Sequence, residues 1–232
     1  MSNSKLFGLT GNQLKILAVI FMTIDHIGML LFPQIRLFRM IGRLAFPIFA
    51  YTFAEGCKYT KNRMRHFLTL SIIGFLCQIV YSLLTHSLYM NILITLSLSA
   101  AMIYSYDIAK KQDKFISYLF PAVVLVAIFF ICQIMPKILD GTDFDIDYGF
   151  LGAMLPVLVY YGKTKEDKLI LLSVGLLALA ISSGATQLLA IFAVPILYFY
   201  NEKRGKWRMK YFFYIYYPVH IVVIFLIGLF LI

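Results

Sequence analysis

The stretch LKILAVIFMTIDHIGMLLF, residues 14–32, is apolar along most of its length, and its ionisable residues are Lys15, Asp25 and His26. A helix needs about 20 mostly apolar residues to cross the hydrocarbon core of a bilayer. Runs near this length recur along the chain, with short polar segments between them. They predict transmembrane helices near residues 12–33, 40–57, 65–85, 90–109, 117–136, 147–162, 168–182, 184–201 and 209–231.

The composition also favours a membrane protein. Hydrophobic residues make up 61% of the chain and charged residues only 14%, with a mean hydropathy of +0.84. Soluble domains are about a quarter charged, so a soluble fold of this composition would lack the polar residues to cover its surface. We therefore expect an all-α, polytopic bundle of about nine transmembrane helices. It would form one transmembrane domain over residues 1–232, in the inner (cytoplasmic) membrane of a bacterial cell.

Basic residues alternate between the predicted connections. They gather in the second, fourth, sixth and eighth connections: Lys58, Lys61, Arg63 and Arg65; Lys110, Lys111 and Lys114; Lys163, Lys165 and Lys168; Lys203, Arg204, Lys206, Arg208 and Lys210. Cytoplasmic loops carry an excess of lysine and arginine, so the pattern predicts a cytoplasmic amino terminus. The first predicted connection is an exception to this alternation, because it is odd-numbered and also holds basic residues. This topology accounts for most of the net charge of +10, and no nucleic-acid partner is expected.

The first predicted span carries a lysine and a histidine on one face. His26 follows Lys15 by eleven residues, which is close to three helical turns and roughly 16 Å along the axis. Lys15 would lie near the cytoplasmic end and His26 past the midplane. Lys15 is either a snorkelling anchor or an anion-binding group. His26 either makes a structural hydrogen bond or takes part in chemistry, because ionisable groups inside a membrane are costly.

The second predicted span supplies possible partners for the charges of the first. Arg43 would lie in the layer of Asp25 and His26, and Glu55 in the layer of Lys15. Pairing Arg43 with Asp25 and Lys15 with Glu55 would satisfy all four charges. Arg39, one turn before Arg43, is a second candidate partner for Asp25.

The last predicted span contains a slanting polar stripe. Tyr214, Tyr217 and His220 recur at intervals of three residues, and His220 would lie near the midplane. His220 is either a structural hydrogen-bond donor or part of a site. In contrast, Gln78, Gln133 and Gln187 are expected to make hydrogen bonds between helices, and Cys57, Cys77 and Cys132 are expected to serve packing.

The residues present favour acid–base chemistry. No nucleophilic serine motif, phosphate loop or metal-ligand spacing occurs, and the four histidines lack an H-x-x-x-H pattern. A histidine with carboxylates and arginines nearby suits general-base catalysis of acyl transfer from a thioester to an amine or hydroxyl. The same groups would suit a proton-coupled transporter, although no internal repeat typical of transporters is visible.

Four strings resemble the TraX family, named for the F-pilin acetylase. They are LKILAVIFMTIDHIG (14–28), IGRLAFPIFAYTFAEG (41–56), TKNRMR (60–65) and YFFYIYYPVH (211–220). The wider transmembrane acyltransferase superfamily carries a basic residue, ten residues and then a histidine on its first such helix. Lys15 and His26 match that spacing. Lysine stands where many members have arginine, and it offers phosphate a point charge rather than a bidentate contact.

The resemblance implies an acetyltransferase with acetyl-CoA as donor, His26 as catalytic residue and Lys15 near the CoA phosphates. We expect His26 to act as a general base, with acetylated His26 as the alternative. Asp25, Arg43 and Glu55 complete the candidate catalytic group, and Tyr214, Tyr217 and His220 join Lys15 as candidate acetyl-CoA-binding residues. The expected partners are acetyl-CoA, an unidentified acceptor and the lipid bilayer, and a homodimer is left open.

Overall fold

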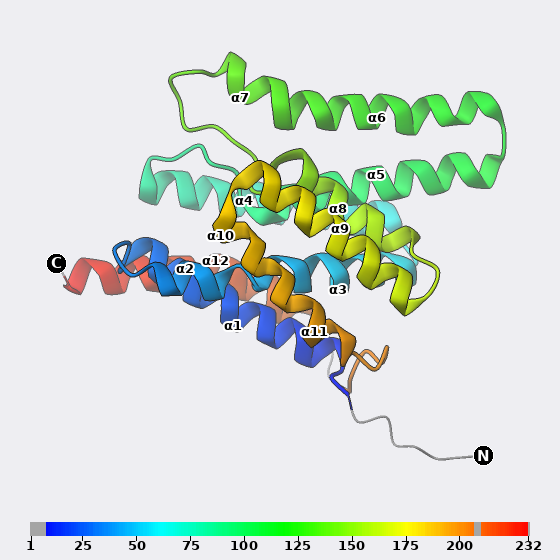
Figure 1. Ribbon diagram of the computed structural model, residues 1–232. Coiled ribbons are helices and arrows are strands. Elements are labelled where there is room, and N and C mark those ends of the chain that lie inside the picture. Colours follow the sequence, from blue (N-terminus) through cyan, green and yellow to red (C-terminus); the bar gives the residue numbers. More distant parts are fainter. Residues whose placement is uncertain (1–7, 207–209, 232) are drawn as a thin grey trace. The chain divides into compact units, whose positions relative to one another are not determined.

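The computed structural model describes residues 8–206 and 210–231, and these residues are mainly helical (Figure 1). Two isolated β-bridges, Leu9 with Tyr200 and Met90 with Ile146, are the strand-like pairings in the described residues. The all-α prediction is therefore confirmed. Arg208, one of the basic residues of the eighth connection, lies outside the described residues.

Six helices within the described ranges are long and apolar enough to cross a membrane. They are Gly11–Leu30 (α1), Arg36–Tyr59 (α2, Arg36–Gly42, with α3, Ala45–Tyr59), Arg63–Thr85 (α4), Ile92–Gln112 (α5), Phe115–Ile138 (η1, Phe115–Tyr118; α6, Leu119–Phe129; η2, Phe130–Ile134; α7, Met135–Ile138) and Phe212–Phe230, within α12 (Lys210–Leu231). A multi-pass membrane protein follows from these lengths. The cytoplasmic amino terminus stays a prediction.

The three remaining predicted spans also fall on helices. Residues 147–162 correspond to α8 (Gly149–Tyr161), 168–182 to α9 (Lys165–Ser183), and 184–201 to a broken helix of α10 (Ala185–Leu188), η3 (Leu189–Phe192) and α11 (Ala193–Tyr198). Gly184, at φ 95°, ends α9 and precedes α10. Whether these three segments cross the membrane, and hence the count of nine, stays a prediction.

The chain divides into two compact units, and the division falls within α3 and after α8. The first unit runs to Thr52 and resumes at Lys163, while the second takes Phe53–Gly162. The prediction of a single transmembrane domain is not tested by this division and stays a prediction.

In the first unit, α1 packs against α2 and α12. A capping box fixes the start of α1, because the Thr10 hydroxyl accepts from the Gln13 amide while the Gln13 side chain accepts from the Thr10 amide. The segment before α1 is tied to the segment after α11. The Leu9 amide donates to the Phe199 carbonyl at 2.8 Å, and the Gly11 amide to the Lys203 carbonyl at 2.8 Å. These bonds hold the beginning of α1 in place.

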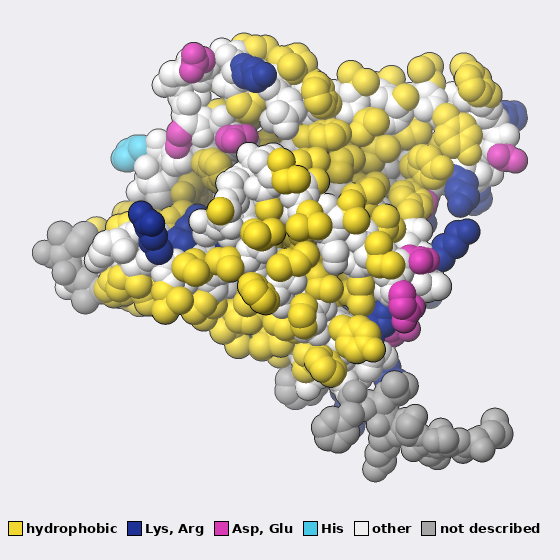
Figure 2. Space-filling view, in the orientation of Figure 1, with side chains coloured by type: hydrophobic (Ala, Val, Ile, Leu, Met, Phe, Trp, Pro, Cys, Tyr) yellow, Lys and Arg dark blue, Asp and Glu magenta, His cyan; other side chains and the backbone are white. Residues whose placement is uncertain are grey.

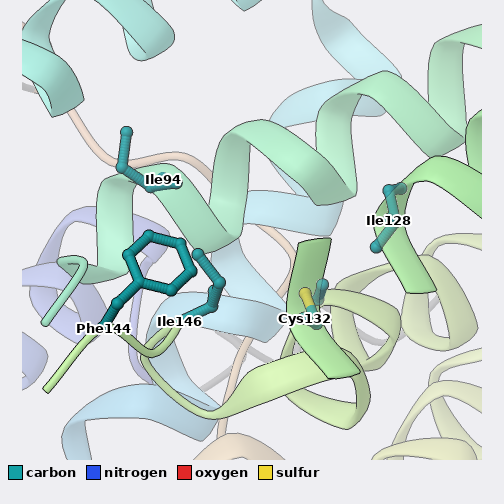
Figure 3. Close-up of a cluster of buried hydrophobic side chains, with 6 residues drawn as sticks. Ile94, Ile128, Cys132, Phe144 and Ile146 are labelled. Carbon is teal, nitrogen blue, oxygen red and sulfur yellow. The ribbon is translucent and has the colours of Figure 1, made fainter. Parts of the chain in front are cut away.

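In the second unit, a buried cluster joins α5, the α6–η2 segment, the loop before α8, and α8 itself. Figure 3 shows Ile94, Ile128, Cys132, Phe144 and Ile146 converging from the first three of these. All three cysteines of the sequence are buried and none forms a disulfide, so the prediction that they serve packing agrees with the structure.

A polar network at Asp107 also lies in the second unit. Its carboxylate pairs with the Arg63 guanidinium at 2.8 Å. It also accepts from the hydroxyls of Tyr160 at 2.6 Å and Tyr161 at 3.3 Å. Both carboxylate oxygens are thus used, and the network joins α4, α5 and α8.

The surface is dominated by apolar side chains. Figure 2 shows hydrophobic side chains over most of the visible face, with lysine, arginine and acidic residues in small groups. Large side chains such as Phe115, Ile181 and Phe230 are 96%, 87% and 89% exposed. An exposed apolar surface this large would be unfavourable in water and is suited to contact with lipid, in agreement with the membrane assignment.

Candidate functional site

The candidate site is built where α1 meets α12, inside the first unit. His26 of α1 and His220 of α12 lie with Nδ1 of His26 3.2 Å from Nε2 of His220. Their ring centroids are 4.9 Å apart and the rings meet edge to face at 68°. His220 is 5% exposed. The two histidines that the sequence placed at similar depth are therefore in direct contact.

The neighbouring carbonyls determine which ring nitrogens carry hydrogen. Nδ1 of His26 lies 2.9 Å from the Met22 carbonyl, and Nδ1 of His220 lies 3.0 Å from the Tyr216 carbonyl. A carbonyl only accepts, so we assign the hydrogen of each neutral ring to Nδ1. The lone pair of each ring is then at Nε2. Nε2 of His26 has no hydrogen-bond partner among the described residues.

Tyr216 and Thr23 hold the two helices together beside the histidines. The Tyr216 ring stacks on His220, with centroids 5.2 Å apart and planes at 7°. Its hydroxyl lies 2.7 Å from the Thr23 hydroxyl. Since the Thr23 hydroxyl donates to the Val19 carbonyl, the Tyr216 hydroxyl is the donor between them. Sequence reasoning missed both residues, although the spacing of four between Tyr216 and His220 places them on one helix face.

Of the predicted stripe, Tyr217 lies against His220. The Tyr217 ring meets the His220 ring edge-on, with centroids 5.5 Å apart, and Tyr217 is 6% exposed. Tyr214, one turn earlier in α12, is partly buried. The assignment of Tyr214, Tyr217 and His220 to acetyl-CoA binding stays a prediction.

Lys15 faces the same neighbouring helix as His26. Its ammonium nitrogen lies 5.9 Å from the centroid of the Phe213 ring of α12, while His26 contacts His220 two turns further along that helix. The shared face predicted for Lys15 and His26 is thus confirmed. Whether Lys15 binds anions or only anchors the helix stays a prediction.

Asp25 pairs with Arg39, one of its two candidate partners. An Arg39 nitrogen lies 2.5 Å from Oδ2 of Asp25, whereas Oδ1 has no hydrogen-bond partner in the described part of the chain. The Asp25 carboxyl lies directly over Gly42 of α2, where a Cβ would overlap it. Glycine at position 42 therefore allows α1 and α2 to approach with Asp25 between them.

Arg43 forms a hydrogen bond to a third helix. Its guanidinium donates to Oε1 of the buried Gln187 of α10 at 3.3 Å, which confirms an interhelical hydrogen bond for Gln187. Gln78 of α4 accepts from the Asn91 amide at 3.0 Å, so it too bonds outside its own helix. For Gln133 the prediction stands untested.

Glu55 lies in the part of α3 that belongs to the second unit and is 7% exposed. Its predicted pairing with Lys15 stays a prediction, as do the catalytic roles of Asp25, Arg43 and Glu55. Within residues 8–206 and 210–231, no group of three or more histidines, cysteines and carboxylates could hold a metal ion.

A profile of the TraX protein family matches residues 10–228. The chain belongs to the TraX family. It is 33% identical to an uncharacterised protein of Rickettsia prowazekii (strain Madrid E) over 157 residues, which cover 67% of this chain and 57% of that protein. It is 25% identical to a probable fimbrial assembly protein of Dichelobacter nodosus, serogroup H1, over 91% of this chain and 93% of that protein. No solved structure matches.

Proposed function

We propose that this TraX-family protein is a membrane-embedded acetyltransferase. It moves an acetyl group from cytoplasmic acetyl-CoA to an amine or hydroxyl acceptor in or across the membrane, with His26 as general base. The observation that carries the proposal is the state of the His26 ring. Nδ1 is fixed by the Met22 carbonyl at 2.9 Å, and Nε2 is left with its lone pair. A base needs a ring held in one orientation with one nitrogen available.

The reaction balances without a metal. The acceptor nitrogen or oxygen attacks the thioester carbonyl and forms the new bond to carbon. Nε2 of His26 takes the acceptor proton as this bond forms. The carbon–sulfur bond then breaks and the CoA thiolate leaves, and the proton on His26 returns to that thiolate. The products are the acetylated acceptor and CoA with a free thiol, and His26 is regenerated.

Lys15 is suited to hold the phosphates of acetyl-CoA. It lies on the face of α1 that carries His26, nearer the predicted cytoplasmic end, and its ammonium is a compact point charge. This contact is the same before and during the reaction, so it contributes to KM rather than to kcat. In this proposal Lys15→Ala raises KM for acetyl-CoA several-fold and leaves kcat nearly unchanged. A variant with normal KM and lowered kcat would remove this role from Lys15.

The names of the family and of one relative suggest which acceptor to test first. The family is named for a pilin acetylase, and the Dichelobacter relative carries a name that refers to fimbrial assembly. A subunit of a surface appendage is therefore the first acceptor to test, beside lipid and sugar hydroxyls.

The proposal is tested with the purified protein in detergent and acetyl-CoA labelled in the acetyl group. Wild type should release CoA and transfer label in the presence of membrane extract. The variant His26→Ala should lose about 10²–10⁴-fold in kcat while it still inserts and binds acetyl-CoA. Near-normal transfer by a well-folded His26→Ala would exclude His26 as the base.

A second measurement separates base from nucleophile. Without an acceptor, label should stay off the protein if His26 is a base. Acid-labile labelling that His26→Ala abolishes would identify an acetyl-imidazole instead.

One observation also suits a proton-coupled transporter. Two contacting histidines inside membrane helices are a known form of proton pathway. Proton flux into liposomes without any acetyl transfer would favour that function over the acetyltransferase.

A further inference from the structure

In the His26–His220 hydrogen bond, His26 is the donor and His220 is the acceptor. Because Nδ1 of His220 donates to the Tyr216 carbonyl, its Nε2 can only accept, and it faces Nδ1 of His26 at 3.2 Å. The Nδ1 hydrogen of His26 is therefore shared between the Met22 carbonyl and Nε2 of His220. Hydrogen bonds from a cationic donor are roughly twice as strong as neutral ones. The contact thus strengthens when His26 gains a proton.

We propose that His220 is a positioning residue that fixes the His26 ring and stabilises its cation through the Nδ1–H···Nε2 hydrogen bond. The proposal rests on the acetyltransferase function. It replaces the acetyl-CoA-binding role that the sequence suggested for His220. In many hydrolases a carboxylate takes this place behind the catalytic imidazole. Here the nearest carboxylate in sequence, Asp25, is engaged with Arg39, and a neutral imidazole supplies the acceptor.

The surroundings of His220 support a fixed acceptor. Tyr216 stacks on one face of the His220 ring at 5.2 Å, and Tyr217 meets it edge-on at 5.5 Å. The Tyr216 hydroxyl is in turn tied to Thr23 of α1 at 2.7 Å. Thr23 precedes His26 by three residues, so the two helices are joined at two adjacent points. A ring held in this way loses little freedom when it accepts the hydrogen bond.

The direction of the bond allows a sharp pair of variants. The side-chain oxygen of glutamine can occupy the place of Nε2 and accept from His26, whereas leucine fills similar space and cannot accept. We expect His220→Leu to lower kcat about 10- to 100-fold, the range for loss of a hydrogen bond to a charged group. His220→Gln should stay within about threefold of wild type in kcat. KM for acetyl-CoA should change in neither variant.

Both variants are measured beside wild type and His26→Ala, with thermal unfolding in detergent as the check on folding. Equal kcat in the leucine and glutamine variants would overturn the proposal, and so would a rise in KM with unchanged kcat. If the leucine variant fails to fold, kcat of His220→Gln is compared with that of His220→Asn instead. The shorter amide of asparagine cannot reach Nδ1 of His26. Glutamine active and asparagine impaired supports the proposal, and the reverse overturns it.

The result is separable from the proposed function. If wild type transfers no acetyl group, the acetyltransferase itself is wrong. If His26→Ala is inactive while His220→Leu keeps wild-type kcat, the acetyltransferase stands and only the positioning role of His220 is excluded.

Discussion

The α1–α12 contact and the Asp107 network use similar residues in different ways. In the network, both oxygens of the Asp107 carboxylate accept hydrogen bonds. In the same unit, His66 of α4 bonds through Nδ1 to the Tyr104 hydroxyl at 2.7 Å. At the α1–α12 contact, Nε2 of His26 has no partner in the described residues. Buried polar groups are normally satisfied. Groups that are satisfied stabilise a bundle, while a ring nitrogen left over is available for chemistry.

The largest expected effect comes from the same substitution at two histidines. His26 and His66 each have a hydrogen bond at Nδ1, and asparagine can reproduce that end of the ring but not Nε2. His26→Asn should therefore lose about 10²–10⁴-fold in kcat, as His26→Ala does. His66→Asn should keep kcat within about twofold of wild type because it loses no base. The measurement is kcat for acetyl transfer by the two purified variants. Equal losses in kcat would show that His26 and His66 do not differ in their role.

The two carboxylates offer the second comparison, in stability. Asp107→Ala leaves Arg63, Tyr160 and Tyr161 without their shared acceptor, at a cost of about 2–3 kcal/mol in the free energy of unfolding. Asp25→Ala removes one ion pair and should cost about 1 kcal/mol. Unfolding of the purified variants in detergent, by heat or denaturant, ranks them. A larger loss for Asp25→Ala would show that the first unit depends on its ion pair more than the second depends on its network.

The third comparison concerns helix packing. A Cβ at position 42 would overlap the Asp25 side chain, whereas a Cβ at position 56 of α3 would meet nothing within 4 Å. Gly42→Ala should destabilise by about 1–3 kcal/mol through overpacking, and it should disturb the Asp25–Arg39 pair. Gly56→Ala should be neutral or stabilise by up to about 1 kcal/mol, because alanine is the better helix former. Unfolding curves of the two variants and wild type measure these changes in stability. If Gly42→Ala is as stable as wild type, α1 and α2 can move apart at position 42 without loss of stability.

The smallest effect is expected in the acidic loop of the second unit, outside both sites. Hydrogen bonds from the Ser87 side chain and the Leu88 amide hold the pKa of Asp143 below its usual value. A lowered folded pKa adds stability above the unfolded pKa of about 3.9 and loses it as the pH falls through the folded value. The melting temperature of wild type should thus exceed that of Asp143→Asn slightly at pH 6, and the difference should shrink as the pH falls below the unfolded pKa and vanish below the folded one. A difference that persists in acid would point to a packing role for Asp143.

Hydropathy predicted the helices well because each run of apolar residues is long and bounded by polar residues. Hydropathy did not predict that the segment over residues 184–201 is broken into the short elements α10, η3 and α11. Helical spacing also predicted that Lys15 and His26 share a face.

The side-chain contacts were harder to predict from the sequence than the helices. Arg39 and Arg43 are one turn apart, so spacing could not choose between them as the partner of Asp25. The His26–His220 contact joins residues 194 positions apart, and only the packing of α1 on α12 reveals it. Tyr216 was overlooked because a stripe at intervals of three does not include it.

The separation of α1 from α12 along the chain also governs when the site can exist during synthesis. Ribosomes deliver the chain from its amino terminus at about 5–20 residues per second, so α1 enters the membrane well before α12 is made. His26 is therefore present early, but its contact with His220 can form only after the second unit, which lies between them in the chain, has been translated. A nascent or prematurely ended chain would carry the proposed base without its positioning partner. Assembly of the last helix thus sets the moment at which this protein could become active.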